Sequence, residues 1–146
     1  MNRLATILSS KESAVHVIAP DVTVIGAVRE MCQARVGSLL VVEGATLVGI
    51  FCERDLMTRV VLEKRDPAAT VVRDVMTTNV ISVSPDMTSH DAMALMTSRR
   101  VRHLPVTEGA RIVGIVSIGD LVRSVVADGE RRVGELEGYV EGRYPA

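Results

Sequence analysis

The stretch GIFCERD (residues 49–55) returns as GIVSIGD (residues 114–120), 65 positions further along a chain of 146 residues. Both copies keep a glycine, an isoleucine and a final aspartate, while Cys52 is replaced by Ser117 three residues before that aspartate. A frame repeated at such a distance indicates that the chain contains two copies of one structural unit.

The likeness extends outward, since residues 15–61 align with residues 80–126 without a gap. The apolar runs of each copy predict a strand, a helix, a hairpin of two strands and a final helix. Thr23 and Thr88 each follow Pro-Asp and predict the N-cap of the first helix. The expected strands are residues 15–19, 38–42 and 47–51 in the first copy and 80–84, 103–107 and 112–116 in the second.

One unit of about 50 residues buries too little apolar surface to be stable alone. Two units are therefore expected to cover each other about a pseudo-two-fold axis, with a pair of clefts at the seam. The predicted fold is mixed α/β, of the α+β class: two β-α-β-β-α repeats packed through their sheets. The predicted division is a first repeat with a lead-in segment (4–62), a linker (63–71), a second repeat with its own lead-in (72–127) and a partly helical tail (128–146), each lead-in tethering the copy that it precedes.

The composition limits the possible partners. Aromatic residues make up 2% of the chain and the net charge is -1, which argues against nucleic acid, because single strands bind by stacking in basic grooves. No apolar run is long enough for a membrane span or a signal peptide, so we expect a soluble cytoplasmic protein without a membrane partner. Cys32 and Cys52 are expected to be free, buried thiols.

Three stretches carry a family resemblance: VRDVMT (72–77), RRVRHLPV (99–106) and the frame at 114–120. With them the chain resembles a tandem pair of CBS domains, the Bateman module, over roughly residues 4–126. The resemblance implies a non-catalytic regulatory module whose ligand contains adenine, such as AMP, ADP, ATP, NAD or S-adenosylmethionine. It also implies a homodimer. Ligand occupancy would then be read by a separate effector protein, or by the dimer itself.

The resemblance implies that Asp55 and Asp120 bind ribose, since a carboxylate accepts hydrogen bonds from both ribose hydroxyls. Ser117 would add a hydroxyl to the sugar or phosphate, whereas Cys52 lacks that hydroxyl. A capping box is the alternative for Ser117 and Asp120, because the spacing S-x-x-D is also an acidic variant of that motif.

Phosphate contacts are implied at Arg102 and His103, for which a solvated basic edge is the alternative. The adenine would lie between aliphatic walls, and its edge would be read by the first strand of each copy. By analogy each cleft pairs the aspartate of one copy with the strand start of the other, so the two clefts are expected to differ in affinity or ligand. The implied sets are Asp55 with Val101, Arg102 and His103; Asp120 and Ser117 with Val36, Gly37 and Ser38; walls at Ile50, Ile115, Val36 and Val101; and first-strand residues Val17, Ile18, Ile81 and Ser82.

Two other functions stay open at this point. An enzyme is disfavoured because the chain has no P-loop, Rossmann, zinc-protease or nucleophile-elbow motif, and no metal or catalytic residues are predicted. A ligand-free dimeric scaffold that holds a partner protein is the second alternative. The stretches DLMTRVV (55–61) and DLVRSVV (120–126) are the expected dimer surfaces.

Overall fold

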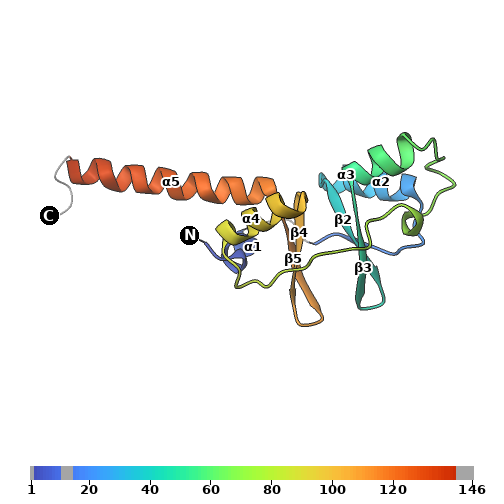
Figure 1. Cartoon of the computed structure of the whole chain (residues 1–146), viewed down its shortest axis with the longest axis horizontal. Helices are drawn as coiled ribbons and strands as arrows, with labels where there is room; N and C mark the ends of the chain where they lie inside the picture. Colours follow the sequence, from blue (N-terminus) through green and yellow to red (C-terminus); the bar gives the residue numbers. More distant parts are fainter. Residues whose placement is uncertain (1, 11–14, 141–146) are drawn as a thin grey trace.

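The computed structural model describes residues 2–10 and 15–140, with side chains up to residue 129 (Figure 1). The first repeat contains β1 (Val17–Ile18), α2 (Val24–Ala34), β2 (Ser38–Glu43), β3 (Thr46–Cys52) and α3 (Glu53–Asp55), which continues as the π-helical segment η1 (Leu56–Val61). The second contains α4 (Ser89–Arg99), β4 (His103–Glu108), β5 (Arg111–Ser117) and α5 (Ile118–Val140). Two further elements, α1 (Leu4–Ser10) and the short 3-10 helix η2 (Val72–Asp74), precede the repeats.

The predicted caps and turns are confirmed. The Thr23 hydroxyl accepts a hydrogen bond from the amide of Gly26 at 3.2 Å, and the Thr88 hydroxyl accepts one from the amide of Asp91 at 3.2 Å. Each hairpin turns at a glycine with positive φ, 63° at Gly44 and 62° at Gly109. Residues with a Cβ atom rarely adopt this conformation. The local chemistry of the repeated sequence therefore fixes the same backbone twice.

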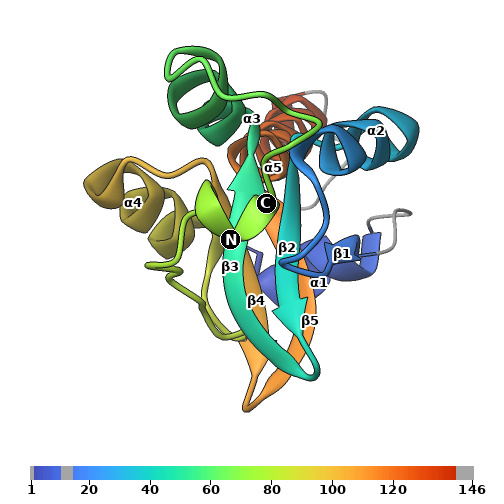
Figure 2. The same ribbon diagram turned by 90° about the vertical axis from the view of Figure 1, so that its right-hand side faces the viewer.

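The sheets confirm the predicted topology except at one strand. In the first repeat β1 pairs in parallel with β2, which pairs antiparallel with β3. In the second repeat β4 and β5 form the matching hairpin, but the strand expected at 80–84 is reduced to a single bridge between Val83 and Val106. The chain turns directly afterwards, because the Ser84 hydroxyl accepts a hydrogen bond from the amide of Asp86 at 3.2 Å. Figure 2 shows the two hairpins one behind the other.

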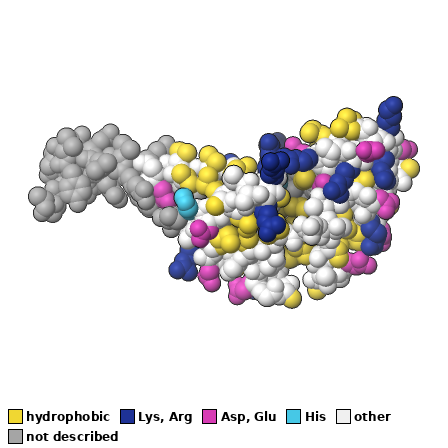
Figure 3. Space-filling view, viewed as in Figure 1, with side chains coloured by type: hydrophobic (Ala, Val, Ile, Leu, Met, Phe, Trp, Pro, Cys, Tyr) yellow, Lys and Arg dark blue, Asp and Glu magenta, His cyan; other side chains and the backbone are white. Residues whose placement is uncertain are grey.

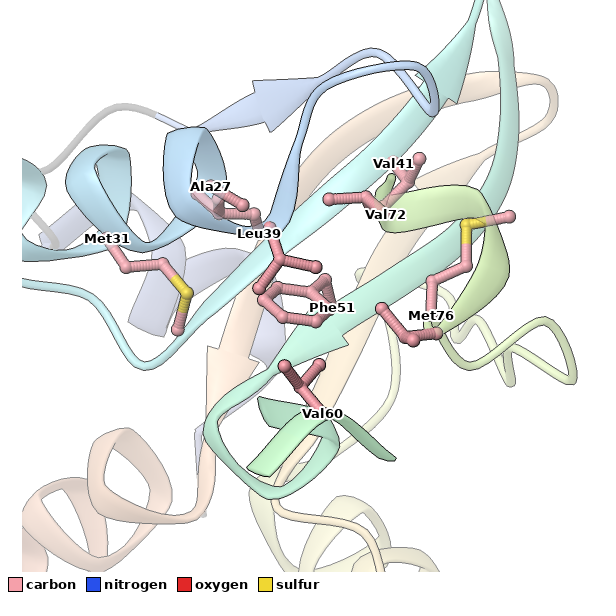
Figure 4. Packing of buried hydrophobic residues seen from close by; sticks show 10 residues of the cluster. Ala27, Met31, Leu39, Val41, Phe51, Val60, Val72 and Met76 are labelled. Carbon is pink, nitrogen blue, oxygen red and sulfur yellow. The ribbon is translucent and has the colours of Figure 1, made fainter. Parts of the chain in front are cut away.

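Each repeat has its own hydrophobic core. In the first, Phe51 is fully buried with Leu39 and Val60 between the sheet and the helices (Figure 4). In the second, Val116 occupies the position that matches Phe51 and is also fully buried. The two-repeat fold predicted from the sequence is thus confirmed.

The lead-in segments exchange partners, so the prediction that each tethers the copy it precedes is wrong. The amide of Leu4 donates to the carbonyl of Met87 at 2.9 Å, and α1 fills the second core through Leu4 and Ile7. Conversely, Val72 is part of the first core, and its amide donates to the carbonyl of Val22 at 2.8 Å. The apolar side chains of each lead-in fill the core of the other repeat, and adjacency in sequence does not decide the packing.

The last helix is longer than one repeat requires. α5 runs without a break from Ile118 to Val140, so the helix of the second repeat and the helical part of the tail form one element that projects from the body (Figure 1). Residues 141–146 of the tail lie outside the described residues. Among the helices described, none combines the length and the apolar character needed to cross a bilayer.

Both cysteines are free, as predicted, but only one is sheltered. Cys52 is partly buried at the end of β3, whereas Cys32 is exposed, so its predicted burial is wrong. Cys32 directly follows Met31, which packs in the core, and a helix rotates successive residues away from one another.

Candidate functional site

Both repeated aspartates lie in the first turn of a helix that leaves the hairpin. Ser117, the last residue of β5, faces His103 across the hairpin, and Cys52, the last residue of β3, faces Ser38. Asp120 follows three residues after Ser117, which brings its carboxylate back to the end of the strand. The hairpin register therefore places each carboxylate beside the start of a strand.

The capping box expected as an alternative for Ser117 and Asp120 is present. The amide of Asp120 donates to the Ser117 hydroxyl at 3.1 Å, and the amide of Ser117 donates to Oδ2 of Asp120 at 2.8 Å. Arg123 donates from Nη2 to the other carboxylate oxygen, Oδ1, at 2.6 Å. These bonds hold the buried carboxylate of Asp120 in one orientation.

A cavity of about 310 Å³ lies at the seam between the two repeats, beside Asp120. It brings together residues that the sequence analysis assigned to one cleft, contributed by both repeats. They are Val36, Gly37 and Ser38 from the first repeat and Ile115, Ser117 and Asp120 from the second.

Two arginines and a histidine that the sequence analysis missed also line this cavity: Arg35, Arg123 and His16. Arg123 follows Asp120 by three residues, a helical spacing that places the two side chains together and could have identified it. Arg35 is the C-cap of α2 and has a positive φ of 57°. The local sequence does not predict this conformation. The guanidinium groups give the cavity a cationic side.

Apart from His103, the remaining lining residues have no polar side chain. They are Leu8, Val15, Leu40, Val113 and Gly114. Leu8 comes from α1, and its contribution follows from the exchange of lead-in segments, which sequence reasoning missed. An ideal Cβ on Gly114 would lie 2.8 Å from Cδ2 of Leu8, so α1 approaches the strand closely at this point.

His103 is in a different place from the one predicted. It was assigned to the cleft of Asp55, but it lines the cavity of Asp120. His103 pairs with Ser117 across the second hairpin, and an ideal Cβ on Gly37 would lie 3.7 Å from its Nε2. His103 therefore spans the seam on the side of Asp120.

Asp55 has different surroundings. The amide and the thiol of Cys52 lie 3.0 and 3.2 Å from its Oδ2, and the Thr77 hydroxyl donates to its Oδ1 at 2.9 Å. Nε of Arg59 lies 3.8 Å from the same Oδ1. Burial raises the pKa of the Cys52 thiol, and the nearby Asp55 carboxylate adds to this rise. Asp55 is not among the residues that line the described cavity.

The strand start expected to share a cleft with Asp55 is divided: Val101 and Arg102 lie outside the described cavity, whereas His103 lines it. Nη1 of Arg54 donates to the carbonyl of Arg100 at 3.3 Å, which joins the two repeats on this side. Arg102 is exposed, and Val101 packs against the second core. Figure 3 shows Lys and Arg side chains gathered at the junction of the two halves.

The other predicted wall and first-strand residues are distributed over both cores. Ile18 packs on the first core and Ile81 on the second, while Val17 is 50% exposed. Ser82 is exposed, and the amide and carbonyl of Ile50 both bond to Thr77. None of these five residues lines the described cavity, where Val15 and His16 take the place predicted for the first strand. Within the described part of the chain, no group of three His, Cys, Asp or Glu side chains is arranged to hold a metal ion.

Known proteins share both the sequence and the fold. The chain is 40% identical over 129 residues to CBS domain-containing protein CBSX3, mitochondrial, of Arabidopsis thaliana; the match covers 85% of this chain and 63% of the plant protein. A protein with CBS domains from Burkholderia ambifaria superposes with a TM-score of 0.84 at 41% identity, covering 87% of this chain and 96% of its own.

A more distant solved structure holds small molecules. The CBS domain pair of protein MJ0100, in complex with 5'-methylthioadenosine and S-adenosyl-L-methionine, has a TM-score of 0.77 at 22% identity, covering 88% of this chain and 98% of its own. The family model of the CBS domain matches twice, at residues 11–62 and 72–127. The two repeats, their shared frame and these matches show that the chain belongs to the CBS domain family.

Proposed function

We propose that this CBS domain pair is a non-catalytic sensor that binds an adenine nucleotide in the cavity beside Asp120. One observation carries the proposal: a single cavity at the seam combines a buried carboxylate, aliphatic walls and cationic side chains from both repeats. These are the three kinds of group that a ribose, an adenine ring and a phosphate require.

Each part of the nucleotide has a matching group. The ribose hydroxyls donate to Asp120, which Ser117 already holds in place. The adenine ring lies between the aliphatic side chains of Val36 and Ile115. The phosphate accepts a hydrogen bond from Arg123. The side chain of Arg123 is 72% exposed, so it has room to turn from the Asp120 carboxylate toward the ligand.

Charge and size narrow the ligand class. The guanidinium groups of Arg35 and Arg123 outnumber the single carboxylate among the residues lining the described cavity, which favours an anionic ligand over a cationic sulfonium. The MJ0100 domain pair holds two uncharged or cationic adenosine compounds, so the charge of this cavity predicts a different preference. A volume of about 310 Å³ lies at the small end of ligand pockets, which suits a nucleoside monophosphate better than a dinucleotide.

Binding would act by population shift. The cavity is lined by both repeats, by α1 through Leu8 and by α5 through Arg123. A ligand therefore favours the arrangement of these elements that binds it best, and α5 carries the change away from the body. A separate effector protein, or a second copy of the chain, would read the position of α5.

Thermal shift and isothermal titration with AMP, ADP, ATP, NADH and S-adenosylmethionine test the proposal. Binding to the native state raises the melting temperature by linkage, and AMP is expected to give the largest rise. Asp120→Asn is expected to weaken AMP binding at least tenfold, while Asp74→Asn, on an exposed residue outside the cavity, serves as the control. If no adenine compound binds at millimolar concentration, the ligand-free scaffold is the better description. Multiple turnover of ATP by the purified protein would contradict a non-catalytic role.

We also propose that the protein forms a homodimer, because two of its helices carry exposed apolar side chains. Met57, Val61 and Leu62 at the end of the first repeat are 59, 63 and 73% exposed, and Val122, Val125 and Val126 on α5 are 44, 47 and 51% exposed. Figure 3 shows hydrophobic side chains along α5 and over the last helix of the first repeat, α3 with η1. The inner faces of the same helices pack in the cores through Val60 and Leu121, so each helix has both roles.

The oligomeric state is measured by sedimentation velocity. We expect a dimer for the natural chain and a monomer for the variant Val122→Asp combined with Val126→Asp. Val17→Asp, at a residue that is 50% exposed but distant in sequence from both helices, is the control. A natural chain that is monomeric at every concentration would contradict the proposed dimer.

A further inference from the structure

The first lead-in segment places a leucine in the wall of the cavity beside Asp120. Leu8 belongs to α1, which precedes the first repeat but packs on the second. An ideal Cβ on Gly114 would lie 2.8, 3.3 and 3.6 Å from Cδ2, Cδ1 and Cγ of Leu8. The Leu8 side chain therefore lies directly over this glycine, and a side chain at residue 114 would displace it.

The matching glycine of the first frame is covered in the same way. Met76 and Thr77, both from the second lead-in segment, lie closest to the position of a Cβ on Gly49. In each repeat the exchanged lead-in thus covers the glycine of the repeated frame. The group that closes the space over this glycine is therefore not encoded by the repeat itself.

The rest of α1 holds Leu8 in place. Leu4 and Ile7, on the same helix, are buried in the second core. Nδ2 of Asn2 donates to the hydroxyl of Ser124 on α5 at 3.0 Å, which fixes the segment just before the helix. Leu8 itself is partly buried and packs against the same core. Such support from neighbouring contacts gives a wall residue one defined position.

The position of Leu8 along β5 indicates which part of a nucleotide it meets. Ser117 and Asp120, the proposed ribose contacts, lie at the end of this strand. Gly114 precedes Ser117 by three residues, which is about 10 Å along an extended strand, and it adjoins the proposed adenine wall Ile115. With the ribose at the strand end and the base beside Ile115, the six-membered ring of the base extends toward Leu8.

The chemistry of Leu8 indicates which edge of that ring it accepts. Its side chain ends in two methyl groups, which neither donate nor accept hydrogen bonds. On the six-membered ring of adenine, N1 and N3 accept hydrogen bonds and the 6-amino group donates them, so each would lose its bonds to water against a methyl group. The C2–H group has no such bonds to lose. The leucine therefore suits adenine with its C2–H group toward α1.

From this placement we infer that Leu8 is a specificity-determining residue, which admits adenine and excludes a base with a substituent at C2. This inference rests on the proposed function, because it assigns the base specificity of the same cavity. Guanine carries an amino group at C2, which would have to displace Leu8 or lie unpaired against its methyl groups. The first lead-in segment then determines which purine the cavity accepts.

Nuclear Overhauser effects between the natural chain and AMP test the contact directly. With labelled leucine methyl groups, we expect an effect from the Leu8 methyls to H2 of adenine and none to H8, which lies on the five-membered ring. The methyls of Leu4, fully buried in the second core, are the control and should show no effect. Bound AMP with effects from Leu8 to H8 alone, or with none, would overturn the inference and leave the proposed function intact. If AMP does not bind, the proposed function fails and the inference fails with it.

Isothermal titration with AMP, GMP and 2-methylthio-AMP tests the specificity. The natural chain should bind GMP and 2-methylthio-AMP at least about tenfold more weakly than AMP, since one methylene group already has an effect of this size in a closely fitting pocket. Leu8→Ala removes Cγ and both Cδ atoms, so it should bind 2-methylthio-AMP at least as tightly as AMP, and the gap between AMP and GMP should narrow roughly threefold or more. Ile7→Ala, at a buried neighbour outside the described cavity, is the matched control and should keep the natural preferences. Natural preferences in Leu8→Ala as well would overturn the inference.

Discussion

The frames at residues 49–55 and 114–120 have the same backbone but different partners. In both, an amide at the end of a strand donates to the aspartate, at 3.0 Å in the first and 2.8 Å in the second. The first carboxylate also accepts from the Thr77 hydroxyl of the second lead-in segment, whereas the second accepts from Arg123 and lines the cavity at the seam. The repeat thus determines the local geometry, while side chains that differ between the copies, such as Arg123, and residues outside the repeat, such as Thr77, determine what each carboxylate contacts.

The largest difference between the repeats is expected in the unfolding free energy that is lost when matching core residues are truncated. Phe51 and Val116 occupy matching positions and are both fully buried. Phe51→Ala is expected to lower the free energy of unfolding by about 3–5 kcal/mol, because it deletes a ring and leaves a cavity. Val116→Ala removes two methyl groups and should cost about 1–3 kcal/mol. Urea denaturation measures both, with Phe51→Leu as a control of intermediate effect, and equal losses at the two positions would contradict the comparison.

The internal repeat made the paired cores and both caps predictable, since Thr23, Thr88 and the apolar spacing act within a few residues. Val36, Gly37 and Ser38 were expected beside Asp120 only through the family resemblance, which pairs the aspartate of one copy with the strand start of the other. The exchange of the lead-in segments was missed, because the contacts of Leu4 and Val72 join residues far apart in sequence, and no local pattern records them. For the same reason no local pattern predicts Leu8 in the cavity or Thr77 at Asp55.

The matching glycines offer a second contrast. A Cβ added at Gly49 would lie 2.6 Å from Sδ of Met76 and 2.9 Å from the backbone oxygen of Thr77, whereas at Gly114 it would meet the side chain of Leu8 at 2.8 Å. Backbone cannot yield as easily as the end of a leucine. Gly49→Ala is therefore expected to cost about 1–3 kcal/mol of unfolding free energy, and Gly114→Ala less.

The glycine variants also differ in their expected effect on the ligand. Gly114→Ala should push Leu8 into the cavity and weaken AMP binding, while Gly49→Ala should leave the affinity near that of the natural chain. Urea denaturation and titration with AMP measure the two effects separately. The comparison fails if Gly49→Ala weakens AMP binding as much as Gly114→Ala does.

A third test addresses the phosphate contact proposed for Arg123 in the cavity beside Asp120. Arg123 and Thr58 occupy matching positions in the two final helices, and only Arg123 lines the described cavity. Arg123→Gln is expected to raise the dissociation constant of AMP about tenfold, equivalent to about 1.4 kcal/mol, through loss of a charge-assisted bond. Thr58→Ala is the control and should change it less than twofold.

Adenosine distinguishes a phosphate contact from a general disturbance. Its affinity should be nearly the same in the natural chain and in Arg123→Gln, because it has no phosphate. The tenfold effect on AMP should also shrink in concentrated salt, since the guanidinium is largely exposed. Equal losses for AMP and adenosine would indicate that Arg123 supports the cavity and does not contact phosphate.

The smallest effect is expected at Cys52, which Ser117 replaces in the second frame. Burial raises the pKa of the Cys52 thiol from its ordinary value of 9.0, so the folded state holds this proton more tightly than the unfolded state. The thiol therefore contributes stability that is fully present below about pH 9 and is lost as the pH rises through the folded pKa. Cys52→Ser removes this titration, and its melting temperature should decline less steeply than that of the natural chain between pH 9 and 10.5. Iodoacetamide at pH 8 should modify exposed Cys32 before Cys52, as read by peptide mass spectrometry. Faster modification of Cys52 would mean that the first frame opens readily and does not shelter the thiol.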